Sequence, residues 1–219
     1  SSTKIVGFSS KGGEWSLIEP QIIKANDPVT ATYGAFGKFT DENNLAISDI
    51  SRVMMTGVGS SFVKQPIYGL DCRVVPEFDS VGLGGLYLSG LDEAIVVSMG
   101  TGTALIHAKR DGNKTSIKYL GGTGVGGGTL VGLSKLLLSA ENIEHIVEFA
   151  KEGDLANVDL RIKDISAGGS HSTLLSDMTA ANFGDLAEDA SPADLAAGVI
   201  NLVLQAIGTM TVLACRSCG

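Results

Sequence analysis

A glycine-rich stretch in the middle of the chain constrains the fold more than any other feature. Six of the eight residues from Gly121 to Gly128 are glycine, and glycine is costly in ordinary helices and strands because it loses the most backbone freedom on folding. Residues 115–120 alternate like a strand, and residues 130–138 are mostly apolar like a helix. A strand, a glycine loop and a helix N-terminus can bind a phosphate, because N–H groups and the positive end of the helix dipole converge there.

Two other predicted strands also end in glycine. Residues 52–56 are followed by a Gly/Ser loop at 57–61, and residues 94–98 are followed by Gly100, Thr101, Gly102 and Thr103. Ligands of α/β sheets gather at the carboxyl ends of strands, so these loops are candidate phosphate sites. The sequence of the central loop is neither a P-loop nor a dinucleotide fingerprint. A flexible connection there, and a plain hairpin turn at 100–103, therefore remain alternatives.

Composition excludes some partners. The 219 residues carry a net charge of −8, whereas nucleic acids and anionic membranes attract clustered Lys and Arg. We expect neither as a main partner. The chain has only three cysteines, Cys72, Cys215 and Cys218. A small, odd number of cysteines is typical of proteins in a reducing cytoplasm, so we expect a cytoplasmic protein. Cys215 and Cys218 form a C-x-x-C with no second pair and no nearby His, which argues against a zinc site. We expect two thiols at a helix end, with a redox pair as the alternative.

The remaining pattern is that of an α/β protein with a partly parallel sheet, because strands alternate with helices and hairpins are mixed in. We predict a hairpin over 1–18 and a helix from 191 that buries the apolar run 195–214 in the core and does not cross a membrane. Further predicted elements are a helix at 28–43, a strand at 73–75, a helix at 77–90, strands at 94–98 and 104–108, and a helix at 142–151.

Glu77 is the strongest candidate for a catalytic group. It follows a strand and Pro76 at the start of a predicted helix, with Asp79 in the same turn. A carboxylate there can act as a general base that accepts a hydroxyl proton during phosphoryl transfer. The alternative is a first-turn charge that only stabilises the helix dipole.

Four blocks of this chain, in order, resemble the type II pantothenate kinases and their eukaryotic relatives. They are Val75–Asp79, Met99–Thr103, Gly121–Leu133 and Met178–Gly184. The resemblance implies an actin-like ATPase (ribonuclease H-like) fold of mixed sheets with flanking helices. It also implies two lobes, 1–93 and 94–219, the first incomplete at its start and the second at its end. The implied activity is phosphorylation of the primary hydroxyl of pantothenate by ATP with Mg²⁺, the first step of coenzyme A biosynthesis, in a homodimer.

The resemblance also assigns residues. Glu77 matches the catalytic base, and Tyr119, Ala180 and Ala181 fall in segments that contact the substrate, the last two where a partner subunit closes over its tail. The nucleotide-binding segments match Ser1, Ser2, Thr3, Lys4, Thr101, Gly127, Gly128, Thr129, Leu130 and Val131. The family's Mg²⁺-binding Asp would precede Ser1, and its last nucleotide-contacting segment would follow Gly219.

One departure keeps other functions open. Where the family usually has an Arg for the pantothenate carboxylate, this chain has Tyr119 beside Lys118, and Lys lacks the bidentate fork of Arg. The alternatives are a kinase of the same fold with another small-molecule substrate, or a non-catalytic sensor of ATP or acyl-coenzyme A. Acyl-coenzyme A is also expected as a feedback ligand. A purely structural dimer module is disfavoured, because glycine loops at strand ends are poor packing material.

Overall fold

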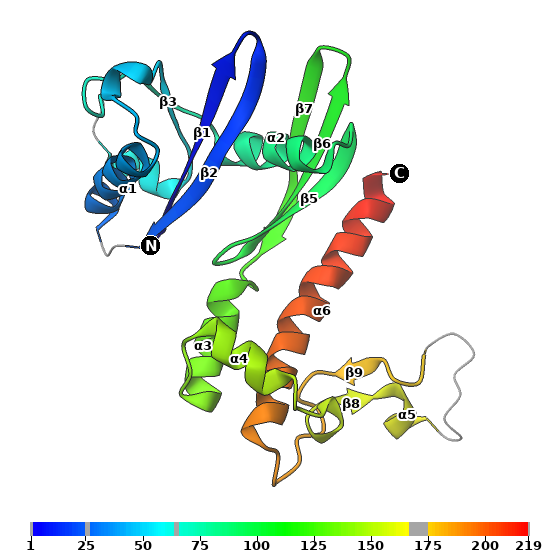
Figure 1. Cartoon of the computed structure of the whole chain (residues 1–219). Helices are drawn as coiled ribbons and strands as arrows, with labels where there is room; N and C mark the ends of the chain where they lie inside the picture. The colour runs from blue at the N-terminus through cyan, green and yellow to red at the C-terminus, as the bar shows by residue number, and fades with distance from the viewer. Residues whose placement is uncertain (1, 25–26, 64–65, 167–174, 219) are drawn as a thin grey trace. The chain divides into compact units, whose positions relative to one another are not determined.

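The structure is a computed structural model that describes residues 2–24, 27–63, 66–166 and 175–218 (Figure 1). The chain divides into two compact units, Ser1–Ser80 and Val81–Gly219. The sequence-based lobes divide at residue 93, whereas these units divide at residue 80, so the lobe boundaries of the whole protein remain a prediction.

The first unit begins with an antiparallel hairpin of β1 (Ser2–Lys11) and β2 (Glu14–Lys24). Gly12 and Gly13 form its turn with φ of +64° and +90°, values that glycine adopts without steric cost. Helix α1 (Pro28–Glu42) packs on this hairpin. A Cβ at Gly7 would lie 2.7 Å from the ring of Phe39, so the missing side chain lets helix and strand approach. The predicted helix is confirmed, and so is the hairpin, whose second strand runs to Lys24, beyond the predicted residue 18.

A short parallel pair completes the first unit. Strands β3 (Val53–Met55) and β4 (Cys72–Val74) pair in parallel, and the N–H of Val75 extends the ladder to the carbonyl of Met55 at 2.8 Å. The 3₁₀ turns η1 (Ile47–Asp49) and η2 (Val58–Phe62) flank β3. The core of this unit consists of Phe36, Met55, Val63 and Ile67.

The second unit is built on a three-stranded antiparallel sheet, β5 (Glu93–Met99), β6 (Thr103–Asp111) and β7 (Lys114–Thr123), in that order. Because β6 runs opposite to both neighbours, the carboxyl ends of β5 and β7 lie at the same edge. Helix α2 (Glu77–Ser89) begins in the first unit and reaches this sheet in the second. A Cβ at Gly82 would lie 2.8 Å from Ile117, so glycine allows close packing of helix on sheet.

Helices and a small two-stranded sheet complete the second unit (Figure 1). Helices α3 (Gly127–Leu138) and α4 (Ile143–Ala150) pack against α6 (Pro192–Cys218). Between α4 and α6 lie η3 (Leu155–Asn157), β8 (Leu160–Arg161), α5 (Ile162–Ile165) and β9 (Thr179–Ala181), with β8 and β9 antiparallel. The polar, glycine-bearing sequence at 166–176 predicts a loop, and most of it lies outside the described residues.

Helix α6 is buried over only part of its length. Ala196, Val199, Val203 and Ile207 are buried, whereas the apolar side chains of the last turns are exposed. The prediction of a core helix therefore holds for the first half only. By length and composition alone α6 would also suffice to cross a membrane.

Candidate active site

The two glycine turns of the second unit bind each other. The N–H of Gly127 donates to the carbonyl of Gly100, and the N–H of Gly128 donates to the carbonyl of Thr101, both at 2.9 Å. The sheet brings them together because one turn follows β5 and the other follows β7 at the same edge. The predicted turn at 100–103 is thus a hairpin connection and a partner of the central loop at once.

Glycine is required here by space. A Cβ at Gly126 would lie 2.7 Å from the backbone of Gly102, and one at Gly102 would lie 2.8 Å from the carbonyl of Thr123. Cβ atoms essentially never approach backbone so closely, so side chains at these positions would push the two turns apart. By contrast, a Cβ at Gly124 would meet nothing within 4 Å.

Three threonine hydroxyls fix the central loop. The hydroxyl of Thr103, a buried residue, donates to the carbonyl of Val125 at 2.9 Å, and that of Thr129 donates to the carbonyl of Gly124 at 2.9 Å. The hydroxyl of Thr123 accepts from the N–H of Val125 at 3.1 Å. A loop with this many internal hydrogen bonds is a shaped element, so the alternative of a flexible connection is not supported.

These bonds decide which groups face a ligand. The N–H groups of Gly127 and Gly128 already have protein acceptors, so they shape the loop. Over the part of the chain that the structure describes, no acceptor is recorded for the N–H of Thr129 or the hydroxyl of the exposed Thr101. Together with the positive end of α3, these groups suit an anion. Leu130 and Val131, half-buried, continue the first turn of the helix.

Glu77 lies in the first unit, at the edge where both parallel strands end. Strand β3 leads into Gly57, whose φ is +87°, and β4 leads through Pro76 into Glu77, the first residue of α2. The Glu77 side chain is exposed and Asp79 is half-buried. Glu77 and the glycine turns belong to different units, so their meeting in one site remains a prediction.

The other predicted residues are dispersed. Tyr119 is exposed on β7 opposite Ile106, next to a bulge formed by Leu120; bulges re-aim neighbouring side chains. On β1, Thr3 is half-buried and Lys4 is exposed, while Ser2 begins the strand and Ser1 lies outside the described residues.

Ala180 and Ala181 are exposed on β9. The turn that follows them is held by the buried carboxylate of Asp159, a residue to which the sequence reasoning assigned no role. The sequence signal was weak: Asp159 lies between the apolar residues Val158 and Leu160, and a charged side chain that is buried with such neighbours needs hydrogen-bond partners.

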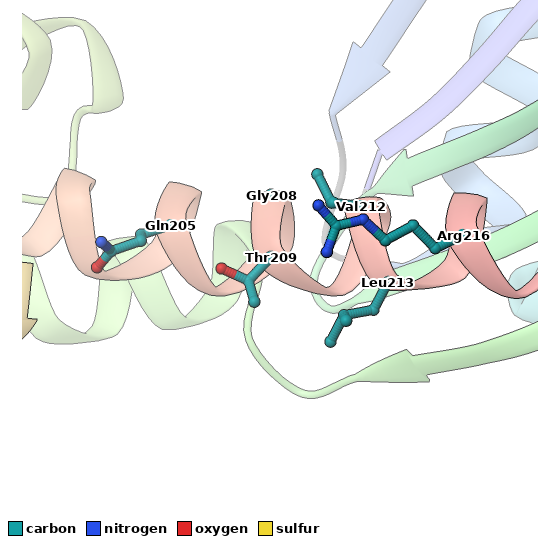
Figure 2. Close-up of a pocket in the computed structure, with 6 residues that line it drawn as sticks. All are labelled: Gln205, Gly208, Thr209, Val212, Leu213 and Arg216. Carbon is teal, nitrogen blue, oxygen red and sulfur yellow. The ribbon is translucent and has the colours of Figure 1, made fainter. Parts of the chain in front are cut away.

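Metal-ligating side chains do not cluster: the described residues contain no group of three or more His, Cys, Asp or Glu. Cys215 and Cys218 are exposed in the last turns of α6. A hollow nearby is lined by α6 alone, through Gln205, Gly208, Thr209, Val212, Leu213 and Arg216 (Figure 2), so it is the face of one helix and is separate from the glycine turns.

Comparison with known sequences identifies the family. The sequence model of the Fumble family matches residues 93–219, which is more than half of the chain. A type II pantothenate kinase from Bacillus cereus is 32% identical over 196 residues, which cover 81% of this chain and 68% of that protein. The chain belongs to the Fumble family of type II pantothenate kinases.

This Fumble family member is similar to several curated relatives. The type II pantothenate kinase from Staphylococcus saprophyticus is 32% identical over 177 residues, 77% of this chain. The chain spans 64% of the length of that relative.

Solved structures show the fold of this family member. The activator of the 2-hydroxyisocaproyl-CoA dehydratase from Clostridium difficile, with bound ADPNP, has a TM-score of 0.57 at 16% identity, covering 95% of this chain and 71% of its own. Component A of the Acidaminococcus fermentans (R)-2-hydroxyglutaryl-CoA dehydratase also has a TM-score of 0.57, at 10% identity, covering 94% and 76%. Both are actin-like ATPase folds, and the predicted fold class is confirmed.

Proposed function

We propose that the protein catalyses ATP-dependent phosphorylation of the primary hydroxyl of pantothenate, the first step of coenzyme A biosynthesis. The observation that carries this proposal is the match to type II pantothenate kinases over about three quarters of the chain. The interlocked glycine turns, which the hydrogen bonds from Gly127 and Gly128 join, support the proposal. Backbone N–H groups held rigidly beside a helix N-terminus suit the phosphates of a nucleotide.

The nucleotide segment runs through both turns in this proposal. Thr101 and Thr129 offer donors to phosphate oxygens, Gly127 and Gly128 hold the loop in shape, and Leu130 and Val131 place the helix dipole behind it. The resemblance also assigns Ser1, Ser2, Thr3 and Lys4 to the nucleotide site, and that assignment is part of the proposal. When bound, Mg²⁺ neutralises charge on the phosphates during transfer.

Glu77 is the proposed general base. Its exposed carboxylate at the start of α2 accepts the proton of the substrate hydroxyl as the oxygen attacks the terminal phosphorus. Tyr119, Ala180 and Ala181 are proposed to contact the substrate. A homodimer, an acyl-coenzyme A feedback ligand and a cytoplasmic location belong to the same proposal; sedimentation velocity with and without acetyl-coenzyme A tests the first two.

A coupled ADP-release assay on the full-length protein tests the function. We expect ADP release with ATP, Mg²⁺ and pantothenate, and none without the alcohol. A panel of other small alcohols at fixed ATP tests the kinase alternative, which Tyr119 and its neighbour Lys118 keep open because neither offers a bidentate fork. Turnover of another alcohol with pantothenate inert would reassign the substrate. ATP binding without ADP release for the whole panel would favour the sensor.

A further inference from the structure

Asp159 carries a fully buried carboxylate that the proposed chemistry does not use. Its side chain accepts hydrogen bonds from four neutral donors. The N–H of Phe183 donates to Oδ1 at 2.9 Å, and Nδ2 of Asn201 donates to Oδ2 at 2.7 Å. Nδ2 of Asn182 and the hydroxyl of Thr179 each donate to Oδ2 at 3.3 Å. We call these five residues the Asp159 hub.

The hub joins three parts of the second unit. Thr179 begins β9, Asn182 and Phe183 form the turn after it, and Asn201 lies on α6. Nδ2 of Asn201 also donates to the Thr179 hydroxyl at 3.2 Å, so two hub members contact each other as well as the carboxylate. The donors come from 20 to 42 residues away in sequence, and their convergence is therefore a product of the tertiary fold.

The turn that the hub holds is conformationally unusual. Phe183 has a φ of +55°, which bulky side chains rarely adopt, and its N–H is the one that reaches Asp159 Oδ1. Its ring lies against α6, since a Cβ at Gly198 would be 3.0 Å from Phe183 Cζ. The N–H of Gly184 closes the turn onto the carbonyl of Ala181 at 3.1 Å. A left-handed residue persists only where its surroundings over-determine it.

Burying a carboxylate costs free energy of desolvation, which its hydrogen bonds must offset before they add net stability. What such a group does supply is a defined geometry for its donors. Here the hydrogen bonds fix the geometry of the three-residue strand β9, in which Ala180 and Ala181 are exposed.

We infer that Asp159 is a positioning residue, which holds residues 179–184 in the conformation that contacts the substrate alcohol. This inference rests on the proposed function, because the contact between this segment and the substrate alcohol belongs to that proposal. Asp159 itself does not touch the substrate, and it acts through the hydrogen bonds of the turn.

The chain offers a matched control in Asp194. Its buried carboxylate also accepts from neutral donors: the N–H of Asp154 at 2.6 Å, the N–H and hydroxyl of Ser191 at 2.9 and 2.8 Å, and Nδ2 of Asn157 at 3.2 Å. These bonds hold the start of α6 and reach none of residues 179–184. Both carboxylates support the same unit, and only one of them holds the β9 turn.

The experiment compares Asp159→Asn and Asp194→Asn in the full-length protein by steady-state kinetics with pantothenate and ATP each varied. For Asp159→Asn we expect the KM for pantothenate to rise about tenfold, with the KM for ATP within about twofold of wild type. For Asp194→Asn we expect both KM values to stay near wild type. Hydrogen exchange of peptides covering 179–184 should accelerate in the first variant and not in the second.

A double variant sharpens the test. In the wild type, Asn201 and Asp159 form an amide–carboxylate pair at 2.7 Å. Asp159→Asn combined with Asn201→Asp restores this pair in reversed order. The KM for pantothenate should then return part of the way to the wild-type value if the geometry of the turn determines it. If Asp159→Asn does not fold, Thr179→Val removes a single donor and is measured in its place, with an expected rise of about threefold.

An unchanged pantothenate KM in a folded hub variant overturns the inference, and so does an equal rise in Asp194→Asn. Inactivity of the wild-type protein toward pantothenate is a different result: it removes the proposed function itself.

Discussion

The two units place glycine at strand ends for opposite reasons. In the first unit, Gly57 follows β3 with a φ of +87° and has nothing within 4 Å of an added Cβ; the backbone conformation demands glycine there. In the second unit, Gly126 has an extended φ of −174° and is confined by the backbone of Gly102. One glycine is needed for its dihedral angles and the other for the space it leaves.

The strand ends of the two units therefore suit different steps of the proposed reaction. The second unit builds a rigid edge from backbone-to-backbone hydrogen bonds, and donors held in place in this way suit the binding of phosphates. The first unit instead presents an exposed carboxylate, Glu77, at the end of a short parallel pair. For its proposed role as the base, this exposure leaves the carboxylate accessible to a substrate hydroxyl.

The largest expected effect divides the two edges by function. Replacing Glu77 with Gln should lower turnover by about 100-fold or more, because the amide cannot accept the hydroxyl proton, while ATP binding remains. Coupled ADP release and nucleotide titration measure the two quantities. Asp79→Asn, in the same helical turn, is the control and should retain most of the turnover. Near-normal turnover of Glu77→Gln would remove Glu77 as the base.

Gly126→Ala tests the packing role of glycine in the second unit. The added Cβ must push the two turns apart, so we expect a loss of about 3 kcal/mol in the free energy of unfolding together with loss of ATP binding. Gly124→Ala, in the same loop but with open space around it, should change the unfolding free energy by less than about 0.5 kcal/mol. Equal behaviour of the two variants in denaturant titrations would contradict the interlocked turns.

Gly57→Ala tests the conformational role in the first unit. Because an L-residue is disfavoured at this φ, we expect a loss of about 1 to 2 kcal/mol in unfolding free energy, with no clash to relieve. Gly59→Ala is the control, since a Cβ there also meets nothing within 4 Å and its φ is not positive. A neutral Gly57→Ala would show that this strand end adapts, unlike the edge of the second unit.

The smallest expected effect is a loss of stability in acid, because it comes from the protonation of a single carboxylate. Hydrogen bonds from the backbone N–H groups of Asp154 and Ser191 lower the pKa of Asp194 from its ordinary 3.8 to about 2. A lowered folded pKa means that the stabilisation is fully present above about pH 4 and is lost as the pH falls through about 2.

Denaturant titrations at pH 5 and pH 2 measure this loss. Wild type should lose more unfolding free energy between the two pH values than Asp194→Asn, which lacks the titrating group. An equal loss in both proteins would show that Asp194 does not carry the acid sensitivity.

Elements whose signals are local can be predicted from the amino-acid sequence. The helix beginning at Pro28 and the strand before Glu77 match the predicted bounds within about one residue. The hairpin turn at Gly12 and Gly13 is also as predicted, although the second strand runs to Lys24 and the prediction ends at residue 18. The reason is that turn chemistry, capping and side-chain alternation act between residues near in sequence. The fold class was also accessible, because four blocks in order resemble one family.

Features that depend on partners far apart in the chain cannot be predicted in this way, and the three-dimensional structure was needed to find them. It showed that Gly127 and Gly128 donate to another turn, that α6 buries only its first half, and that Asp159 gathers donors from β9 and α6. A local pattern carries the propensity of a segment, whereas hydrogen-bond partners and burial are set when segments far apart in the chain meet. For this reason a glycine-rich sequence predicts a flexible backbone, whereas in the folded protein the same glycines allow two backbone segments to pack rigidly together.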